Sequence, residues 1–287
     1  MVAQKTKAWL ELLRVPNLFT VPGDVLVGWC LMGGLGHGIW PICLTIMASL
    51  CLYATGLLLN DAVDARVDAR ERPQRPIPSG RVSLRTVFAV TPVLGTLGIV
   101  LAWQNWACAA ILLGLIVFYD VLAKRIPGLG VLTMGACRGV NVLFGALCVA
   151  SPEAIVQNRL MLVAIGFFVI YTLLISIVAR NEANPNVSPS FWLRWSPALL
   201  TLCLVPLFWI TERSPLWPPL LAVALMLPFV LLRRNIPALV AAHIRHMIPL
   251  QIVWCMIALS PDALFIPVTL LCLWVLSTLS SLFFQGS

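Results

Sequence analysis

Long apolar stretches separated by short polar breaks dominate the chain. A hydrocarbon core about 30 Å thick is crossed by roughly 20 helical residues, and a helix satisfies its own backbone polar groups inside the bilayer. The stretches therefore predict membrane-spanning helices. The ten expected spans are residues 18–35, 39–60, 84–103, 106–120, 130–150, 159–180, 196–211, 216–232, 245–260 and 263–284.

Composition supports the same fold class. Hydrophobic residues make up 60% of the 287 residues, charged residues make up 10%, and the mean hydropathy is +0.96, whereas soluble domains carry roughly 25% charged residues. The alternating segments of about ten residues that are typical of a transmembrane barrel are missing. The sequence predicts an all-α polytopic membrane protein in which residues 1–287 form one domain. Residues 1–16 combine apolar and basic side chains and are expected to lie in the membrane interface.

Basic residues gather beside alternate loops. All but three of the 19 lysines and arginines precede the first span or lie beside the loops after spans two, four, six and eight. Because Lys and Arg are retained on the cytoplasmic side, we expect an integral protein of the cell inner membrane, or its equivalent, with a cytoplasmic N-terminus. The net charge of +8 then reflects topology and attraction to anionic lipids rather than nucleic-acid binding. We expect His243, Arg245 and His246 to form an interfacial turn.

An acidic motif ends the second expected span. Asp61, Asp64 and Asp68, three of the chain's 11 acidic residues, follow Asn60. At about 100° per residue the three carboxylates share one helix face, where like charges repel and a hard cation such as Mg²⁺ finds oxygen ligands. A solvated helix end balanced by nearby arginines is the alternative. Because ionisable groups at membrane depth usually mark a functional cavity, we predict that these four residues bind Mg²⁺ on the cytoplasmic side.

The surrounding residues resemble one enzyme family. The acidic motif is followed by Arg75-Pro76-Ile77-Pro78-Ser79-Gly80-Arg81-Val82-Ser83, and the first span is preceded by Leu13-Arg14-Val15-Pro16-Asn17. Together these segments are similar to the first signature and the first helix of the UbiA superfamily of intramembrane prenyltransferases. The resemblance implies nine helices, or ten in this chain, around a central cavity open near the cytoplasmic side. It also implies Mg²⁺ as cofactor, a prenyl diphosphate as substrate, and substrate-binding roles for Asn17, Asn60 and Arg75.

The second acidic motif of that family, Asp-x-x-x-Asp after the sixth helix, is altered here. The matching place reads Arg180-Asn181-Glu182-Ala183-Asn184-Pro185-Asn186, with one carboxylate. Because asparagine supplies only a neutral oxygen, we expect one firm Mg²⁺ site at the first motif and Glu182 as a weak ligand of a second. Arg180 and Glu182 are expected to help bind the diphosphate. The altered motif, with Arg138-Gly139-Val140-Asn141, resembles the Ebo-cluster branch of the superfamily.

Three further candidates close the fourth span. Tyr119, Lys124 and Arg125 resemble the family's Tyr-x-x-x-Lys element, with one additional residue between the tyrosine and the lysine. We expect Tyr119 to contact the substrate and Lys124 or Arg125 to hold the diphosphate. Anchoring at the membrane surface is the alternative role of the two basic residues.

Polar residues inside the second and fifth spans complete the predicted site. An unpaired guanidinium within a span is costly, so Arg138, beside Asn141, is expected to face the cavity; pairing with Asp24 is its alternative. Tyr53 lies two turns before Asn60 and is expected to line the cavity, where an aromatic face can stabilise an allylic cation.

These residues predict intramembrane prenyl transfer. Asp61, Asp64 and Asp68, assisted by Lys124 and Arg138, are expected to promote departure of diphosphate and so form an allylic cation that an acceptor captures. The sequence does not identify the acceptor, for which a quinone-ring precursor, a tetrapyrrole, a glycerol phosphate and an internal alkene are the candidates. A membrane carrier of an isoprenoid-related precursor on the same fold is the alternative function.

Overall fold

The structure, a computed structural model, describes residues 2–180, 191–210, 220, 222, 236–258 and 263–284. In these ranges the elements are helices and none is a strand, which confirms the all-α prediction. The long helices are α4 (Ile39–Val63), α6 (Leu84–Leu101), α7 (Trp106–Val121), α8 (Leu129–Ala146), α10 (Arg159–Ala179), α14 (Ile236–Ala258) and α15 (Phe265–Phe283). The shorter helices are α1 (Val2–Leu12), α2 (Val15–Leu18), α3 (Val21–Leu31), η1 (Gly34–Gly36), α5 (Ala65–Glu71), η2 (Trp103–Asn105), η3 (Ala123–Arg125), α9 (Pro152–Gln157), α11 (Phe191–Leu202) and α12 (Leu204–Ile210).

Seven described helices are long and apolar enough to cross a membrane. Two shorter apolar helical segments, Val15–Leu31 and Arg194–Leu207, occupy the places of the first and seventh expected spans, and the expected span at 216–232 lies almost wholly outside the described residues. The chain is therefore an integral membrane protein, and the expected count of nine or ten spans stays a prediction.

Two local expectations are wrong. The first expected span, 18–35, is too long, because α3 covers only Val21–Leu31 and is separated from α2, which ends at Leu18; each of these helices has a proline in its first turn. The expected interfacial turn at 243–246 lies inside α14, where His243 and His246 are each only 1% exposed. Packing against the neighbouring helices buries this polar stretch, and α14 consequently begins well before residue 245.

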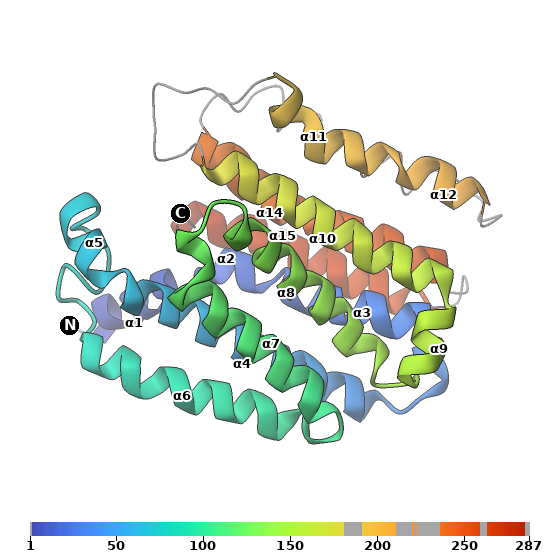
Figure 1. The fold of residues 1–287 in the computed structure, drawn as a ribbon, viewed down its shortest axis with the longest axis horizontal. Coiled ribbons are helices and arrows are strands. Elements are labelled where there is room, and N and C mark those ends of the chain that lie inside the picture. The colour runs from blue at the N-terminus through green and yellow to red at the C-terminus, as the bar shows by residue number, and fades with distance from the viewer. Residues whose placement is uncertain are drawn as a thin grey trace.

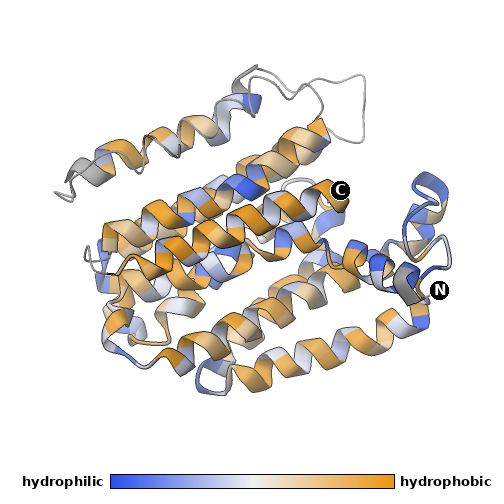
Figure 2. Cartoon of the chain, turned by 180° about the vertical axis from the view of Figure 1, so that it is seen from behind, coloured by the Kyte–Doolittle hydropathy of each residue, from blue (hydrophilic) through white to orange (hydrophobic). Residues whose placement is uncertain are grey.

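The surface of the bundle matches a bilayer. Hydrophobic residues cover most of the helices, whereas hydrophilic residues collect around α5 and the N-terminal end (Figure 2). At the opposite end Trp40, Trp103 and Trp106 are 76%, 65% and 60% exposed. Tryptophan is enriched where membrane meets water, so these three side chains mark the second interface.

Small residues let α3 and α8 approach closely at the centre of the bundle. A Cβ atom at Gly28 would lie 1.9 Å from the carbonyl oxygen of Val142, and one at Gly145 would lie 1.8 Å from the carbonyl oxygen of Val25. Glycine is the residue that permits such backbone contact between membrane helices. The close contact places the polar side chains of α3 beside those of α8.

The predicted cytoplasmic segments share one end of the bundle. Figure 1 shows α1, α5, the connection between α7 and α8, and the end of α10 on one side, with η1, η2 and α9 on the other. Helix α1 packs on this first end through Ala8 and Leu12, which contact a cluster containing Leu58, Ala62 and Val82. The arrangement agrees with the alternation expected from the basic residues, while the assignment of this end to the cytoplasm stays a prediction.

A cysteine at Ser79 tests the orientation. Ser79 is exposed beside α5, so a membrane-impermeant maleimide is expected to label Ser79→Cys in inverted vesicles and not in intact cells. The control is Ser151→Cys, at the exposed start of α9 on the opposite end, which should show the reverse pattern. Labelling of Ser79→Cys from outside intact cells would contradict the orientation.

Candidate active site

A cavity of about 260 Å³ lies among α3, α4, α7, α8, α10 and α14. Its apolar wall is formed by Val21, Leu57, Leu112, Ile116, Met134, Ile175, Val240, Ile244 and Met247. Its polar lining is formed by Arg14, Asn17, Ser49, Tyr53, Asn60, Tyr119, Asp120, Arg138, Asn141, Thr172 and Ser176. A long apolar chain and a polar head group both find matching surfaces here.

Lys124 joins the acidic motif to the rim of the cavity. Its Nζ atom donates to Asn60 Oδ1 at 3.1 Å and to Asp64 Oδ1 at 2.8 Å. The lysine comes from η3, directly after α7, and the two acceptors come from the end of α4. The structure thus brings together three of the residues predicted from the sequence.

Two arginines hold the other carboxylates. Asp61 accepts a hydrogen bond from Arg14 Nη2 at 3.0 Å and lies 3.8 Å from Arg75 Nη1, which also donates to Asp68 at 2.7 Å. Within the described part of the chain, no three acidic, histidine or cysteine side chains are grouped closely enough to hold a metal. The expected stripe of three converging carboxylates is therefore not formed in this structure.

The backbone explains the difference. Helix α4 ends at Val63, and Asp64 lies between α4 and α5 with φ of −86° and ψ of −1°. The three carboxylates consequently do not stay on a single continuous helix. Basic side chains from distant segments occupy the space between them, so electrostatic repulsion along the motif is relieved by ion pairs.

The carboxylate and amide oxygens of the motif are nevertheless suitable ligands for a hard cation. Asn60 Oδ1 and Asp64 Oδ1 converge on one ammonium group, and Asp61 and Asp68 share one guanidinium. Oxygen atoms that converge on one positive charge are the donor type that Mg²⁺ prefers, with substrate phosphates completing its coordination. Binding would require Lys124 and Arg75 to release the carboxylates.

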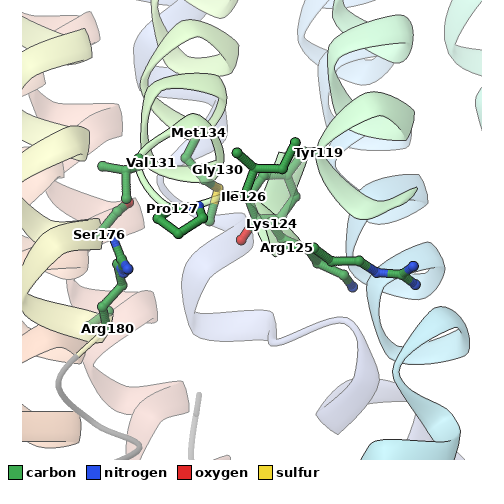
Figure 3. Close-up of a pocket in the computed structure, with 12 residues that line it drawn as sticks. Tyr119, Lys124, Arg125, Ile126, Pro127, Gly130, Val131, Met134, Ser176 and Arg180 are labelled. Carbon is green, nitrogen blue, oxygen red and sulfur yellow. The ribbon is translucent and has the colours of Figure 1, made fainter. Parts of the chain in front are cut away.

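A second cavity of about 340 Å³ adjoins the first. Tyr119, Met134, Ser176 and Ala179 line both cavities. Figure 3 shows Arg180, at the end of α10, on one side and the loop bearing Lys124 and Arg125 on the other. Positive charge therefore borders this cavity from two helices, as an anionic ligand requires.

A buried polar cluster lies deeper, around Asp24. Its Oδ2 atom accepts hydrogen bonds from Arg138 Nη1 at 2.5 Å and Asn141 Nδ2 at 3.1 Å, and its Oδ1 atom accepts one from Gln251 Nε2 at 2.7 Å. Arg138 Nη2 also donates to Thr20 Oγ1 at 2.8 Å. Arg138 lines the cavity and also pairs with Asp24, so both of the roles weighed for this residue from the sequence occur at once.

The neighbours of Arg138 change its expected role. The guanidinium carbon of Arg138 lies 5.7 Å from the centre of the Tyr53 ring. Tyr53 itself lies two helical turns, or about 10 Å along the helix, before Asn60. The partners that the described residues give Arg138 belong to this cluster and not to the acidic motif. Arg138 therefore occupies a Tyr53 face that was expected to meet an allylic cation.

The other predicted residues divide into three groups. Asn17 and Tyr119 line the first cavity, Arg125 and Arg180 line the second, and Asn141 connects Asp24 to Ser49, whose hydroxyl donates to the Asn141 side-chain oxygen. Glu182 and the other motif residues at 181–186 lie outside the described residues.

Sequence reasoning missed Arg14, Asp120 and Gln251 as site residues. Arg14 was noted for its positive charge and as part of a segment that resembles the family's first helix, but no role in the site was expected for it. Its backbone has φ of 43°, the one positive value at a described non-glycine residue. Such backbone conformations are costly and cluster at functional sites. The nearby Pro16 was the available signal for a break in the helix, whereas no local signal connects Gln251 with Asp24, 227 positions away.

Comparisons with known proteins identify the family of the chain. A model described as the UbiA prenyltransferase family matches residues 24–245. Proteins named digeranylgeranylglyceryl phosphate synthase from Methanothrix thermoacetophila and Natronomonas pharaonis are each 32% identical, over 51% and 53% of this chain. Each match covers 56% of the relative, so the chain spans just over half the length of these relatives.

Solved structures show the same fold. A UbiA homologue from Aeropyrum pernix K1 superposes with a TM-score of 0.62 at 13% identity, over 91% of this chain and 98% of the homologue. A structure from a study of digeranylgeranylglyceryl phosphate synthase in membranes gives a TM-score of 0.59 at 20% identity, covering 89% and 99%. The family match over residues 24–245, together with the shared arrangement of the helices, leads to one conclusion: the chain belongs to the UbiA prenyltransferase family.

Proposed function

We propose that this protein transfers a prenyl group inside the membrane from a prenyl diphosphate to an acceptor that carries an anionic group. The observation that carries the proposal is the link made by Lys124, which joins Asn60 and Asp64 at the rim of a largely apolar cavity. An apolar chain fits the cavity, and its diphosphate fits the charged rim.

The basic side chains at the rim can change partners. Arg14, Arg75 and Lys124 neutralise Asp61, Asp68 and Asp64 in this structure. A bound diphosphate offers these cations charge-assisted hydrogen bonds to an anion that carries more than one negative charge, which frees the carboxylates. Asn60, Asp61, Asp64 and Asp68 would then hold Mg²⁺, which stabilises negative charge on the departing diphosphate.

The chain's own residues account for the remaining steps. Lys124 and Arg75 direct positive charge toward the diphosphate as its bond to the prenyl carbon breaks and the bonding electrons leave with the oxygen. Leu112, Ile116 and Ile175 surround the isoprenoid and exclude water, which would otherwise capture the cation.

The acceptor's anionic group fits the second cavity. Arg125 and Arg180 line it, and the two cavities share Tyr119. The relatives named for a glyceryl phosphate product support an acceptor of the same class. We therefore propose a glyceryl phosphate as the first acceptor to test.

Diphosphate release tests the function. Purified protein in detergent is given geranyl, farnesyl or geranylgeranyl diphosphate together with geranylgeranylglyceryl phosphate, with Mg²⁺ or with a chelator. We expect Mg²⁺-dependent release of diphosphate and a prenylated product. If the protein binds the prenyl diphosphates but releases no diphosphate with any acceptor present, the result would favour the carrier function instead.

A further inference from the structure

One carboxylate in the cavity has no described hydrogen-bond partner for its buried oxygen. Asp120, near the end of α7, is 1% exposed and lines the first cavity, and its Oδ1 atom has no hydrogen-bond partner among the described residues. The ammonium of Lys124 lies 4.0 Å away but donates to Asn60 and Asp64. Because a buried polar atom without a hydrogen bond is costly, such an atom requires an explanation.

Asp24 provides the contrast inside the same protein. It is also buried, but both of its oxygens accept hydrogen bonds, from Gln251 on one side and from Arg138 and Asn141 on the other. A carboxylate satisfied in this way stabilises the packing of α3, α8 and α14. Asp120 lacks such a set of donors, so its Oδ1 atom stays available to a ligand.

The position of Asp120 suits the second half of a transfer reaction. Lys124, one helical turn further on, contacts Asp64 at the charged rim, while Tyr119 lines both cavities. Asp120 therefore lies between the predicted diphosphate site and the apolar cavity. An acceptor entering from the second cavity would meet the prenyl cation beside this residue.

We propose that Asp120 accepts the proton that the acceptor loses when it captures the prenyl cation, an inference that rests on the proposed prenyl transfer. The bond between the prenyl carbon and the diphosphate oxygen breaks, and its electron pair leaves with the diphosphate. The acceptor's hydroxyl oxygen forms the new bond to that carbon, and its proton moves to Asp120 Oδ1. The products are an ether that keeps the acceptor's anionic group, free diphosphate and a protonated Asp120.

An anchoring role is the competing explanation. Asp120 and Lys124 are separated by one helical turn, so Asp120 can simply hold the lysine in place. Anchoring predicts that loss of the carboxylate weakens diphosphate binding and ionisation together. Proton acceptance predicts that binding and ionisation survive while transfer is lost.

The test uses the full chain in detergent with Mg²⁺ and geranylgeranyl diphosphate labelled with oxygen-18 at the bridging position. Movement of the label to non-bridging positions reports ionisation, geranylgeranyl thiodiphosphate reports binding, and the product with geranylgeranylglyceryl phosphate reports transfer. In Asp120→Asn we expect transfer to fall by about 10²-fold or more, within the range for a positioned proton acceptor, while binding and label movement persist. Asp120→Glu should restore part of the transfer, and Glu153→Gln, an exposed acid on α9, should match the wild type.

The outcomes separate the hypotheses. Parallel loss of binding, label movement and transfer in Asp120→Asn would assign Asp120 to anchoring Lys124 and overturn proton acceptance. Wild-type transfer in Asp120→Asn would overturn it as well, and both results would leave the proposed function intact. A wild-type protein that shows neither label movement nor transfer would overturn the proposed function and this inference with it.

Discussion

Replacing Asp64 with asparagine is expected to slow Mg²⁺-dependent diphosphate release by about 10²–10³-fold, the usual cost of removing a group that stabilises developing charge. Asparagine keeps the size of the side chain at the junction of α4 and α5 but removes its negative charge. The oxygen that now accepts from Lys124 at 2.8 Å would become a poorer ligand for a hard cation. The rate is measured with geranylgeranyl diphosphate at saturating Mg²⁺.

Glu71→Gln is the matched control for this prediction. Glu71 is an exposed acid at the end of α5, so the same change of charge occurs close by without touching the rim of the cavity. Glu71→Gln is expected to keep the wild-type rate. If Asp64→Asn also kept the wild-type rate of diphosphate release, Asp64 would have no part in the reaction, and the carrier function would be favoured.

The pairing of Asp64 with Lys124 can be measured separately. If the two side chains act together on the diphosphate, the rate of diphosphate release in the double variant Lys124→Met with Asp64→Asn should fall by less than the product of the two single-variant fold-reductions. Neighbouring groups that act as a unit have effects that are not additive in free energy. If the two fold-reductions simply multiply in the double variant, the contact between Asp64 and Lys124 has no part in the reaction.

The sequence predicted the long helices because their signal is local. Uninterrupted apolar runs placed α4, α6, α7, α8, α10 and α15 to within a few residues at most of their ends. The prediction failed where tertiary contacts override local polarity. The polar stretch around His243 and His246 suggested an interface, but neighbouring helices bury both side chains within α14.

The candidate site divides in the same way. Asn60, Asp61, Asp64 and Asp68 lie close in the sequence, so their spacing alone indicated a charged site. Their partners come from elsewhere: Arg14 lies 47 positions from Asp61, and Lys124 lies 60 positions from Asp64. The pairing of basic with acidic side chains depends on how the helices pack, and the local sequence pattern does not predict that packing.

Arg138 illustrates a further limit. The sequence indicated that a guanidinium inside a span needs a partner or a cavity, and the structure provides both. Charge alone suggested assistance to the diphosphate. The observed contacts with Asp24 and Thr20 instead favour a role in fixing α3 against α8.

Removing the charge of Asp24 is expected to destabilise the fold strongly. Asp24 is fully buried, and the Arg138 side chain is only 12% exposed, so Asp24→Asn leaves a positive charge without its counter-ion in a medium of low polarity. Breaking a buried ion pair from one side costs about 3–5 kcal/mol. Thermal unfolding of the purified protein in detergent should show a large fall in midpoint temperature for Asp24→Asn and a similar fall for Arg138→Gln.

The double variant distinguishes a structural pair from a catalytic arginine. Asp24→Asn with Arg138→Gln removes both charges and keeps side chains that can hydrogen-bond to each other, so its stability should recover a large part of the loss. Glu153→Gln on the exposed helix α9 serves as the neutral control for charge. If the recovered double variant still releases diphosphate, Arg138 acts by holding α8 to α3. If it folds but has lost diphosphate release, the guanidinium acts on the substrate, and the role expected from the sequence would be restored.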